Sequence, residues 1–303
     1  MAKYKTPEME KAAQVRAKYS GKSSIDSPGR QAWKRLKRNP TALVGMFIII
    51  VVILVAIFAD VLAPFDPNQP DYMALKKAPD AVHWFGTDSL GRDILSRCIY
   101  GARYSLALSL ATTITSALTG GLLGTIAGYR GGKTDNAIMR VMDVFQAIPM
   151  VLMAMSITAV LGNGIPQLIV AITISSLSIC ARTFRMAILT VRSGEYIESS
   201  RAINIGTFKM ILRHLIPNAV GLLSIQMITI LAASIGLISS LSYIGIGIAP
   251  PTPEWGSILN QGKDFLMSSP HMVIAPTCCI LVAVLGFQLF GVGLRDALDP
   301  RMK

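Results

Sequence analysis

Long stretches without a charged residue divide the chain into segments of membrane-spanning length. A helix needs roughly 20 apolar residues to cross a bilayer core about 30 Å thick. Charge-free stretches that reach this length are residues 39–59, 104–129, 144–181, 214–253 and 265–294. The pattern therefore predicts a chain that crosses a membrane several times.

Turn residues decide how the two longest stretches divide. Gly162-Asn163-Gly164-Ile165-Pro166 interrupts the stretch 144–181 and predicts an antiparallel pair of helices. The stretch 214–253 counts as one span, because its end at 245–253 is too rich in Gly and Pro for a helix in lipid. The expected fold is an all-α membrane protein with six transmembrane helices. Their expected bounds are 41–63, 102–128, 139–161, 167–191, 219–243 and 271–292.

Composition and charge placement agree with this fold. Hydrophobic residues make up 52% of the chain and charged residues only 15%, which is typical of a membrane protein. With the N-terminus inside, inner segments hold 23 of the 29 Lys and Arg residues, as the positive-inside rule requires. Both termini are therefore expected in the cytoplasm. The basic residues at 33–38 are expected to face anionic lipid, and no nucleic-acid partner is expected.

The expected domain organisation follows from these spans. Residues 1–40 form a basic cytoplasmic segment, so the first helix, 41–63, is expected to remain as an anchor and not as a cleaved signal. An extracytoplasmic loop, 64–101, leads to a five-helix core at 102–292, which contains an inner loop at 192–218. Residues 293–303 form a cytoplasmic tail.

Several kinds of chemistry find no support in the sequence. The carboxylates among the spans, Asp60 and Asp143, lie near span ends, which disfavours a proton- or sodium-coupled carrier. Gly132-Lys133-Thr134 is similar to the end of a phosphate-binding loop, but Ala127 stands where its first glycine is required. The histidines and cysteines lack metal-ligand spacing. We therefore expect no enzyme active site, metal site or nucleotide site in this chain.

The inner loop at 195–218, EYIESSRAINIGTFKMILRHLIPN, has the pattern of ordered structure. Its apolar residues recur at spacings of three to five, which predicts two short amphipathic helices. Asn204 and Gly206 tolerate positive φ and would permit a bend between them. Pro217 is suited to the first turn of the next span. On pattern alone, an interfacial helix-turn-helix on the lipid surface is an alternative.

This loop resembles the EAA loop of ABC importer permeases. Glu198 stands at the family's Glu position, and Leu215-Ile216-Pro217-Asn218 matches the end of the motif. The chain departs from the family where Ser199 and Ser200 replace two alanines and Asn204 replaces a glycine. In the family this loop forms a coupling helix that docks on the ATPase subunit. The resemblance implies a coupling role for Glu198, Ser199, Ser200, Asn204, Ile205, Gly206 and Phe208.

The resemblance continues at 33–45, 85–106, 241–259 and 293–302, which are similar to the C-type permease of dipeptide and oligopeptide importers. It implies a type I importer permease fold and a location in the bacterial inner membrane. It also implies four kinds of partner: a second, related permease, two cytoplasmic ATPases that bind ATP and Mg, an extracytoplasmic substrate-binding protein, and the lipid bilayer. No cofactor is expected in this chain. The expected function is half of an ATP-driven import path for di- and oligopeptides.

Other functions are weighed against this expectation. The same architecture could import nickel, glutathione or an antimicrobial peptide, because the binding protein largely selects the cargo. A self-sufficient channel or carrier would be expected to show an intramembrane charge or a filter motif, and a structural scaffold would not require the patterned inner loop. The residues that bind substrate stay unassigned.

Two further patterns each have two interpretations. Small residues at a four-residue spacing would let another helix approach closely, either within this subunit or from a partner permease. They are Thr112, Ser116, Gly120, Gly124 and Gly128. Polar residues of the outer loop either contact a substrate-binding protein or form a polar cap over the helix ends. They are Thr87, Asp88, Gly91, Arg92, Asp93 and Arg97.

Overall fold

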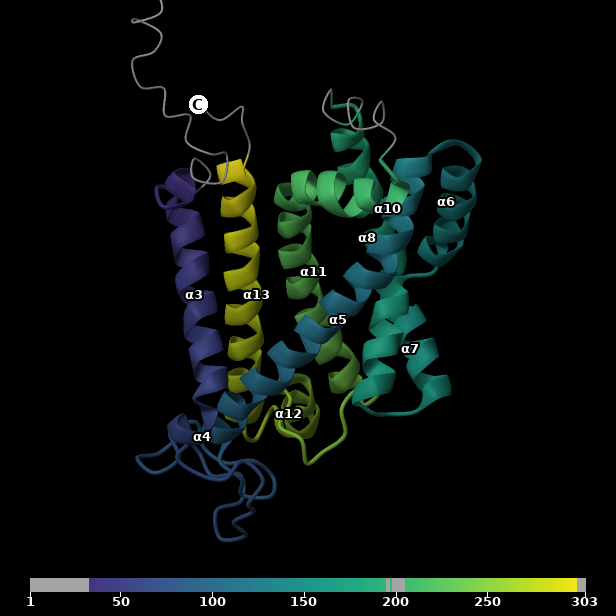
Figure 1. The fold of residues 1–303 in the computed structure, drawn as a ribbon. Coiled ribbons are helices and arrows are strands. Elements are labelled where there is room, and N and C mark those ends of the chain that lie inside the picture. Colours follow the sequence, from purple (N-terminus) through teal and green to yellow (C-terminus); the bar gives the residue numbers. More distant parts are fainter. Residues whose placement is uncertain (1–32, 195–196, 198–204, 299–303) are drawn as a thin grey trace, which may run out of the picture.

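Helices account for nearly all of the regular structure in the computed structural model, which describes residues 33–194, 197 and 205–298 (Figure 1). In chain order they are α3 (Pro40–Ile57), α4 (Ala59–Leu62), α5 (Ile94–Arg130), α6 (Gly132–Ala147), α7 (Met150–Leu161), α8 (Ile165–Arg192), α10 (Thr207–Met210), the π-helical turn η1 (Ile211–Leu215), α11 (Ile216–Ile244), α12 (Trp255–Gly262), the 3₁₀ turn η2 (Lys263–Phe265) and α13 (His271–Leu298).

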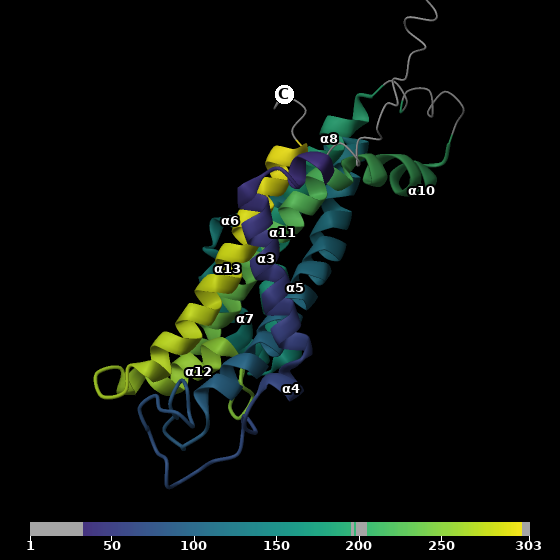
Figure 2. The ribbon, with the colours of Figure 1, turned by 90° about the vertical axis from the view of Figure 1, so that its left-hand side faces the viewer.

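Within the described residues, five helical segments are long and apolar enough to cross a membrane, or six if the bent pair α6 and α7 is counted as one span. The start of α3 and the end of α13 lie at the same end of the bundle in both ribbon views (Figures 1 and 2). An even number of crossings produces this arrangement, which agrees with the expected cytoplasmic location of both termini. We refer to this end of the bundle as the inner end.

The first two spans differ from their expected bounds. Helix α5 begins at Ile94, eight residues before the expected start at 102 and inside the expected outer loop. The expected first helix, 41–63, is interrupted at Phe58, where the backbone leaves the helical region (φ −90°, ψ 20°). Arg103 of α5 donates to the Ala56 and Ile57 carbonyls at 3.0 and 3.1 Å. The guanidinium thus satisfies carbonyl groups that the end of α3 leaves free.

The third span is not the single helix expected at 139–161, because α6 and α7 meet at 85°. Pro149 disfavours the helical region at Ile148, which adopts an extended conformation (φ −96°, ψ 127°) and ends α6. Helix α7 is only 12 residues long, or about 18 Å, and is too short to cross alone. Asp135 of α6 forms an ion pair with Arg185 of α8 at 2.5 Å, which fixes the direction of α6.

Helices α5 and α8 form the central packing unit of the bundle. The small residues on α5 face α8, because a Cβ atom at Gly120 would lie 2.8 Å from the Cβ of Cys180. A Cβ atom at Gly124 would overlap the backbone of Ala181, and one at Gly128 would lie 2.9 Å from the Arg185 carbonyl oxygen. The Ser116 and Ser176 hydroxyls are 2.6 Å apart in the same contact. The stripe therefore lies within this subunit.

The remaining bounds agree closely with expectation at α8 and α11, which extend beyond the predicted 167–191 and 219–243 by three residues or fewer at each end. Helix α13 continues to Leu298, into the expected tail at 293–303. Helix α12 lies between the expected fifth and sixth spans, where no helix was predicted, and its Trp255 and Ile258 pack into a core formed with α11 and α13. The outer connection between α11 and α13 is therefore part of the folded bundle.

Candidate functional site: an inner coupling surface and an outer polar cluster

An apolar cluster at the inner end of the bundle anchors the connection between α8 and α11. Ile197, Met210 and Leu215 are fully buried, and they pack with Ala187 and Ile188 near the end of α8. Burial of a large aliphatic side chain contributes roughly 1.5–3 kcal/mol. Helix α10 and the turn η1 are therefore fixed to the bundle by one side of their surface.

The opposite side of α10 and η1 faces away from the bundle. Phe208 is 77% exposed and Leu212 is 50% exposed, one helical turn apart. Lys209 and Arg213 are also exposed and lie next to them. We call these four residues the coupling face. The segment lies crosswise at the inner end of the bundle in both ribbon views (Figures 1 and 2).

A proline explains how the crosswise segment joins the long helix α11. Pro217 has no backbone N–H and cannot donate to the Arg213 carbonyl, as a residue in a regular α-helix would. The chain forms a π-helical turn at Ile211–Leu215 immediately before this position. Such wide turns accommodate an interruption of the regular hydrogen bonds without ending the helix. Next to it, the Asn218 side chain donates to the His214 carbonyl oxygen at 2.6 Å.

The structure describes only part of the coupling set expected from the sequence. Ile205 is half-buried against the inner cluster, whereas Gly206 and Phe208 are exposed. Gly206 has φ −57°, so it does not use the positive φ that was expected at the bend. The second expected amphipathic helix is continuous with α11 through η1. Glu198, Ser199, Ser200 and Asn204 lie outside the described residues.

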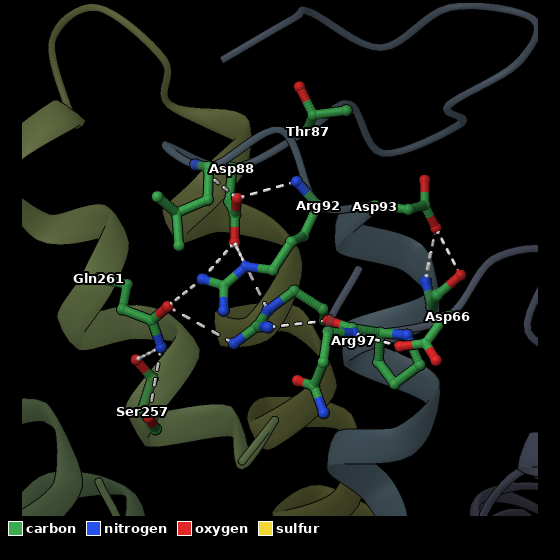
Figure 3. Close-up of polar contacts among 12 residues, drawn as sticks. Asp66, Thr87, Asp88, Arg92, Asp93, Arg97, Ser257 and Gln261 are labelled. Carbon is green, nitrogen blue, oxygen red and sulfur yellow. Dashed lines mark hydrogen bonds and ion pairs between the residues drawn. The ribbon is translucent and has the colours of Figure 1, made fainter. Parts of the chain in front are cut away.

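Polar residues form a second candidate site at the outer end, shown in Figure 3. The Asp88 carboxylate accepts from the Arg92 Nε at 2.7 Å and lies 3.6 Å from the Arg97 Nε. Arg97 also donates to the Pro67 carbonyl at 2.9 Å, and Arg92 donates to Gln261 of α12. The Asp88 and Arg92 side chains are 4% exposed and that of Arg97 is fully buried. The guanidinium groups thus connect α5, the outer loop and α12.

Asp93 joins this outer cluster to the start of α5. Its carboxylate accepts from the Ser96 backbone N–H at 2.7 Å as an N-cap, and it lies 3.0 Å from the His83 Nδ1. Gly91, at φ +78°, makes the tight turn that returns the chain to Asp93. Because these charged groups face one another and are buried, the cluster supports the polar-cap interpretation over contact with a binding protein.

One organising residue at the outer end was not found by sequence reasoning. Glu254 is fully buried, although buried carboxylates are rare. Its carboxylate accepts from the Gly256 and Ser257 backbone N–H groups at 2.9 and 3.0 Å and from the Ser105 hydroxyl at 3.2 Å. Glu254 therefore caps α12 and joins it to α5. Glu is not among the preferred N-cap residues, so composition alone gave no signal.

Comparison with known proteins supplies the family. The model of the binding-protein-dependent transport system inner membrane component matches residues 120–303, which is more than half of the chain. The chain belongs to this family. A second model, that of the N-terminal TM domain of oligopeptide transport permease C, matches residues 27–79 of the permease. Together the two matches confirm the resemblance to C-type permeases of the dipeptide and oligopeptide group.

Curated relatives cover nearly the whole permease. It is 41% identical over 280 residues to the glutathione transport system permease protein GsiD of Escherichia coli, covering 92% of each chain. It is 38% identical over 281 residues to GsiD of Pectobacterium atrosepticum, covering 92% of the permease and 93% of the relative.

A solved structure of the MetNI methionine ABC transporter in an inward-facing conformation has the same fold. Its TM-score is 0.56 at 19% identity, and the match covers 67% of the permease and 96% of that chain. The expected type I importer permease fold is therefore confirmed. The permease is a multi-pass component of an ABC importer in the bacterial inner membrane, and ATP hydrolysis belongs to separate ATPase subunits of such importers.

Proposed function

We propose that this permease forms half of an import path for peptides of a few residues and receives its driving force through the inner loop at 195–218. One observation carries the coupling part of the proposal. The coupling face presents exposed Phe208 and Leu212 from a segment whose other side is anchored by fully buried Met210 and Leu215. Exposed apolar side chains gathered on one surface are typical of a contact with another protein.

The anchoring makes this segment suitable for transmitting a movement. A contact that is fixed to α8 and α11 passes a displacement to both helices, whereas a mobile loop would absorb it. Transport then requires two discrete arrangements of the bundle, because packed interfaces change between states and do not deform continuously. We propose that an ATPase subunit occupies the coupling face, with Glu198, Ser199, Ser200, Asn204, Ile205 and Gly206 contributing to the same contact.

The cargo class is supported by the relatives. GsiD is named as a glutathione permease, and the model at 27–79 is named for an oligopeptide permease. Glutathione is itself a tripeptide, so short peptides form the class that includes both names. We propose that a second, related permease completes the path, that two ATPases bind ATP and Mg, and that an extracytoplasmic binding protein delivers the peptide.

Substitution of Phe208 tests the coupling proposal. Phe208→Asp should abolish ATP-dependent peptide uptake by the reconstituted importer, because a carboxylate replaces the apolar contact while the buried anchors stay intact. Phe208→Leu is the matched control and should retain most uptake, since it keeps an apolar side chain. Only Phe208→Asp should lower the amount of ATPase subunit that copurifies with the permease, or make ATP hydrolysis independent of transport. Equal uptake by both variants would contradict the proposed coupling face.

A separate measurement tests the cargo. Uptake of labelled glutathione and of labelled di- and tripeptides should be compared with uptake of nickel in proteoliposomes that contain the complete importer and its binding protein. Import of a peptide or glutathione, and not of nickel, is the expected result. Import of nickel alone would overturn the cargo proposal and leave the coupling proposal intact.

A further inference from the structure

A groove of about 780 Å³ opens between the outer halves of α3 and α13 and the start of α5. Its walls are almost entirely apolar and include Val51 and Val55 of α3, Ile99 of α5, and Ile274 and Val282 of α13. The volume lies within the range of about 300–1,000 Å³ that is typical of small-ligand sites. The polar cluster around Asp88 and the coupling face do not contribute to this groove.

Glycine residues occur only in the inner part of the contact between α3 and α13. At the inner end, small residues let α3 and α13 approach closely: Gly45 lies against the backbone of Phe290, and a Cβ at Gly286 would lie 2.6 Å from the Cγ2 of Ile48. From residue 48 to the end of α3, and from His271 to residue 285 of α13, there is no glycine. The groove is lined there by branched residues such as Val51, Val55 and Ile274.

The depth of the groove corresponds to one leaflet of a bilayer. Its α13 lining runs from His271, the first residue of the helix, to Val282. At 1.5 Å per residue this distance is about 16 Å, close to half of a hydrocarbon core about 30 Å thick. An acyl chain that enters at the outer membrane surface would therefore be enclosed along the length of its leaflet.

A lysine, Lys76, lines the groove. The Lys76 Nζ lies 4.7 Å from the centre of the Phe265 ring, and no carboxylate of the described residues forms an ion pair with it. The adjacent Lys77, in contrast, pairs with Asp80 at 2.5 Å. Trp84 also lines the mouth and is 69% exposed, as is typical of aromatic residues at a membrane interface.

We propose that this groove holds one acyl chain of an anionic phospholipid from the outer leaflet, with the headgroup phosphate beside Lys76. Charge complementarity selects an anionic headgroup, and the apolar walls select a hydrocarbon chain. The lipid would fill the space between α3, α5 and α13, where an unfilled apolar groove leaves its wall atoms without contact partners. The site is independent of the cargo and of the coupling face.

Native mass spectrometry of the assembled importer tests the site. The complex, purified in mild detergent, is exposed to phosphatidylglycerol or phosphatidylcholine, and retained lipids are counted. We expect one phosphatidylglycerol for each copy of this chain and weaker retention of phosphatidylcholine. Lys76→Glu should lower retention of phosphatidylglycerol by about tenfold, because a repulsive charge replaces an attractive one. Lys77→Glu is the matched control and should retain the lipid as the wild type does.

A groove-filling variant gives an independent second test. Ala275→Trp places a large side chain in the groove and should reduce retention of both lipids, with assembly checked by the copurified partners. Equal phosphatidylglycerol retention by wild type, Lys76→Glu and Ala275→Trp would overturn the proposal. So would an assembled wild-type complex that retains no lipid, because another subunit would then cover the groove. Neither result depends on transport, so both are distinguishable from failure of the proposed import function.

Discussion

Single carboxylates hold the outer end of the bundle together at the residue scale. Asp88 accepts from Arg92 and faces Arg97, while Glu254 accepts from two backbone N–H groups of α12. Each of these acidic groups is buried. Removing one partner from such a contact leaves the other charge or donor buried without a partner. This lowers the free energy of unfolding far more than loss of a surface ion pair does.

Asp88→Asn is therefore expected to destabilise the permease by about 3–5 kcal/mol, because Arg92 and Arg97 lose their buried counter-charge. Thermal unfolding in detergent measures the effect. Asp80→Asn provides the matched control, since the Asp80 pair with Lys77 is partly exposed and an Asn oxygen can still accept from the Val82 and His83 backbone N–H groups. Equal melting temperatures for the two variants would show that the buried cluster is not held by Asp88.

A second residue-scale prediction concerns the contact between α5 and α8. Gly124→Ala should lower the free energy of unfolding by about 1–3 kcal/mol, because the added Cβ would overlap the Ala181 backbone and force the helices apart. Gly236→Ala on α11 is the control, because open space surrounds that position and Ala favours a helix. The same unfolding assay should separate the two variants. A stable Gly124→Ala protein would contradict the close approach of these helices.

At the scale of elements, charge-free runs predict helix existence better than helix ends. The criterion found α8 and α11 because an uncharged stretch covers most of each helix. It missed the first eight residues of α5, because Arg97 and Arg103 interrupt the charge-free stretch. In the folded chain these charges pair with Asp88 and Asp60. Pairing between distant residues is not visible in a one-dimensional pattern.

The break between α6 and α7 is signalled in the sequence by Pro149, which a pattern of charged and apolar residues does not take into account. Pro149→Ala should weaken the break, because Ile148 could then become helical and residue 149 would regain a backbone N–H. Spin labels at Lys133 and Val160 should report a distribution shifted to longer distances. Pro166→Ala is the control, since a proline in the first turn of α8 replaces no intrahelical donor. An unchanged distribution in Pro149→Ala would mean that contacts with α8 alone set the bend.

At the scale of the whole molecule, the bundle has a buried polar cap outside and an exposed apolar face inside. The family was predictable from the motif at 195–218 and from the four further stretches that resemble C-type permeases, whereas the coupling role of the inner loop stays a prediction. The groove beside α3 was not predictable, because its walls come from α3, α5 and α13, which are far apart in the sequence. Such features arise only when the helices are packed together.

ATP-driven transport by the copurified assembly is the most direct test of the proposed importer. The tagged permease, purified in mild detergent, should bring with it a second permease and ATPase subunits, identified by mass spectrometry. Reconstituted with the binding protein, this assembly should accumulate a labelled short peptide only when ATP and Mg are supplied. A stable assembly of this chain alone that moves solute without ATP would contradict the proposal and indicate a self-sufficient carrier.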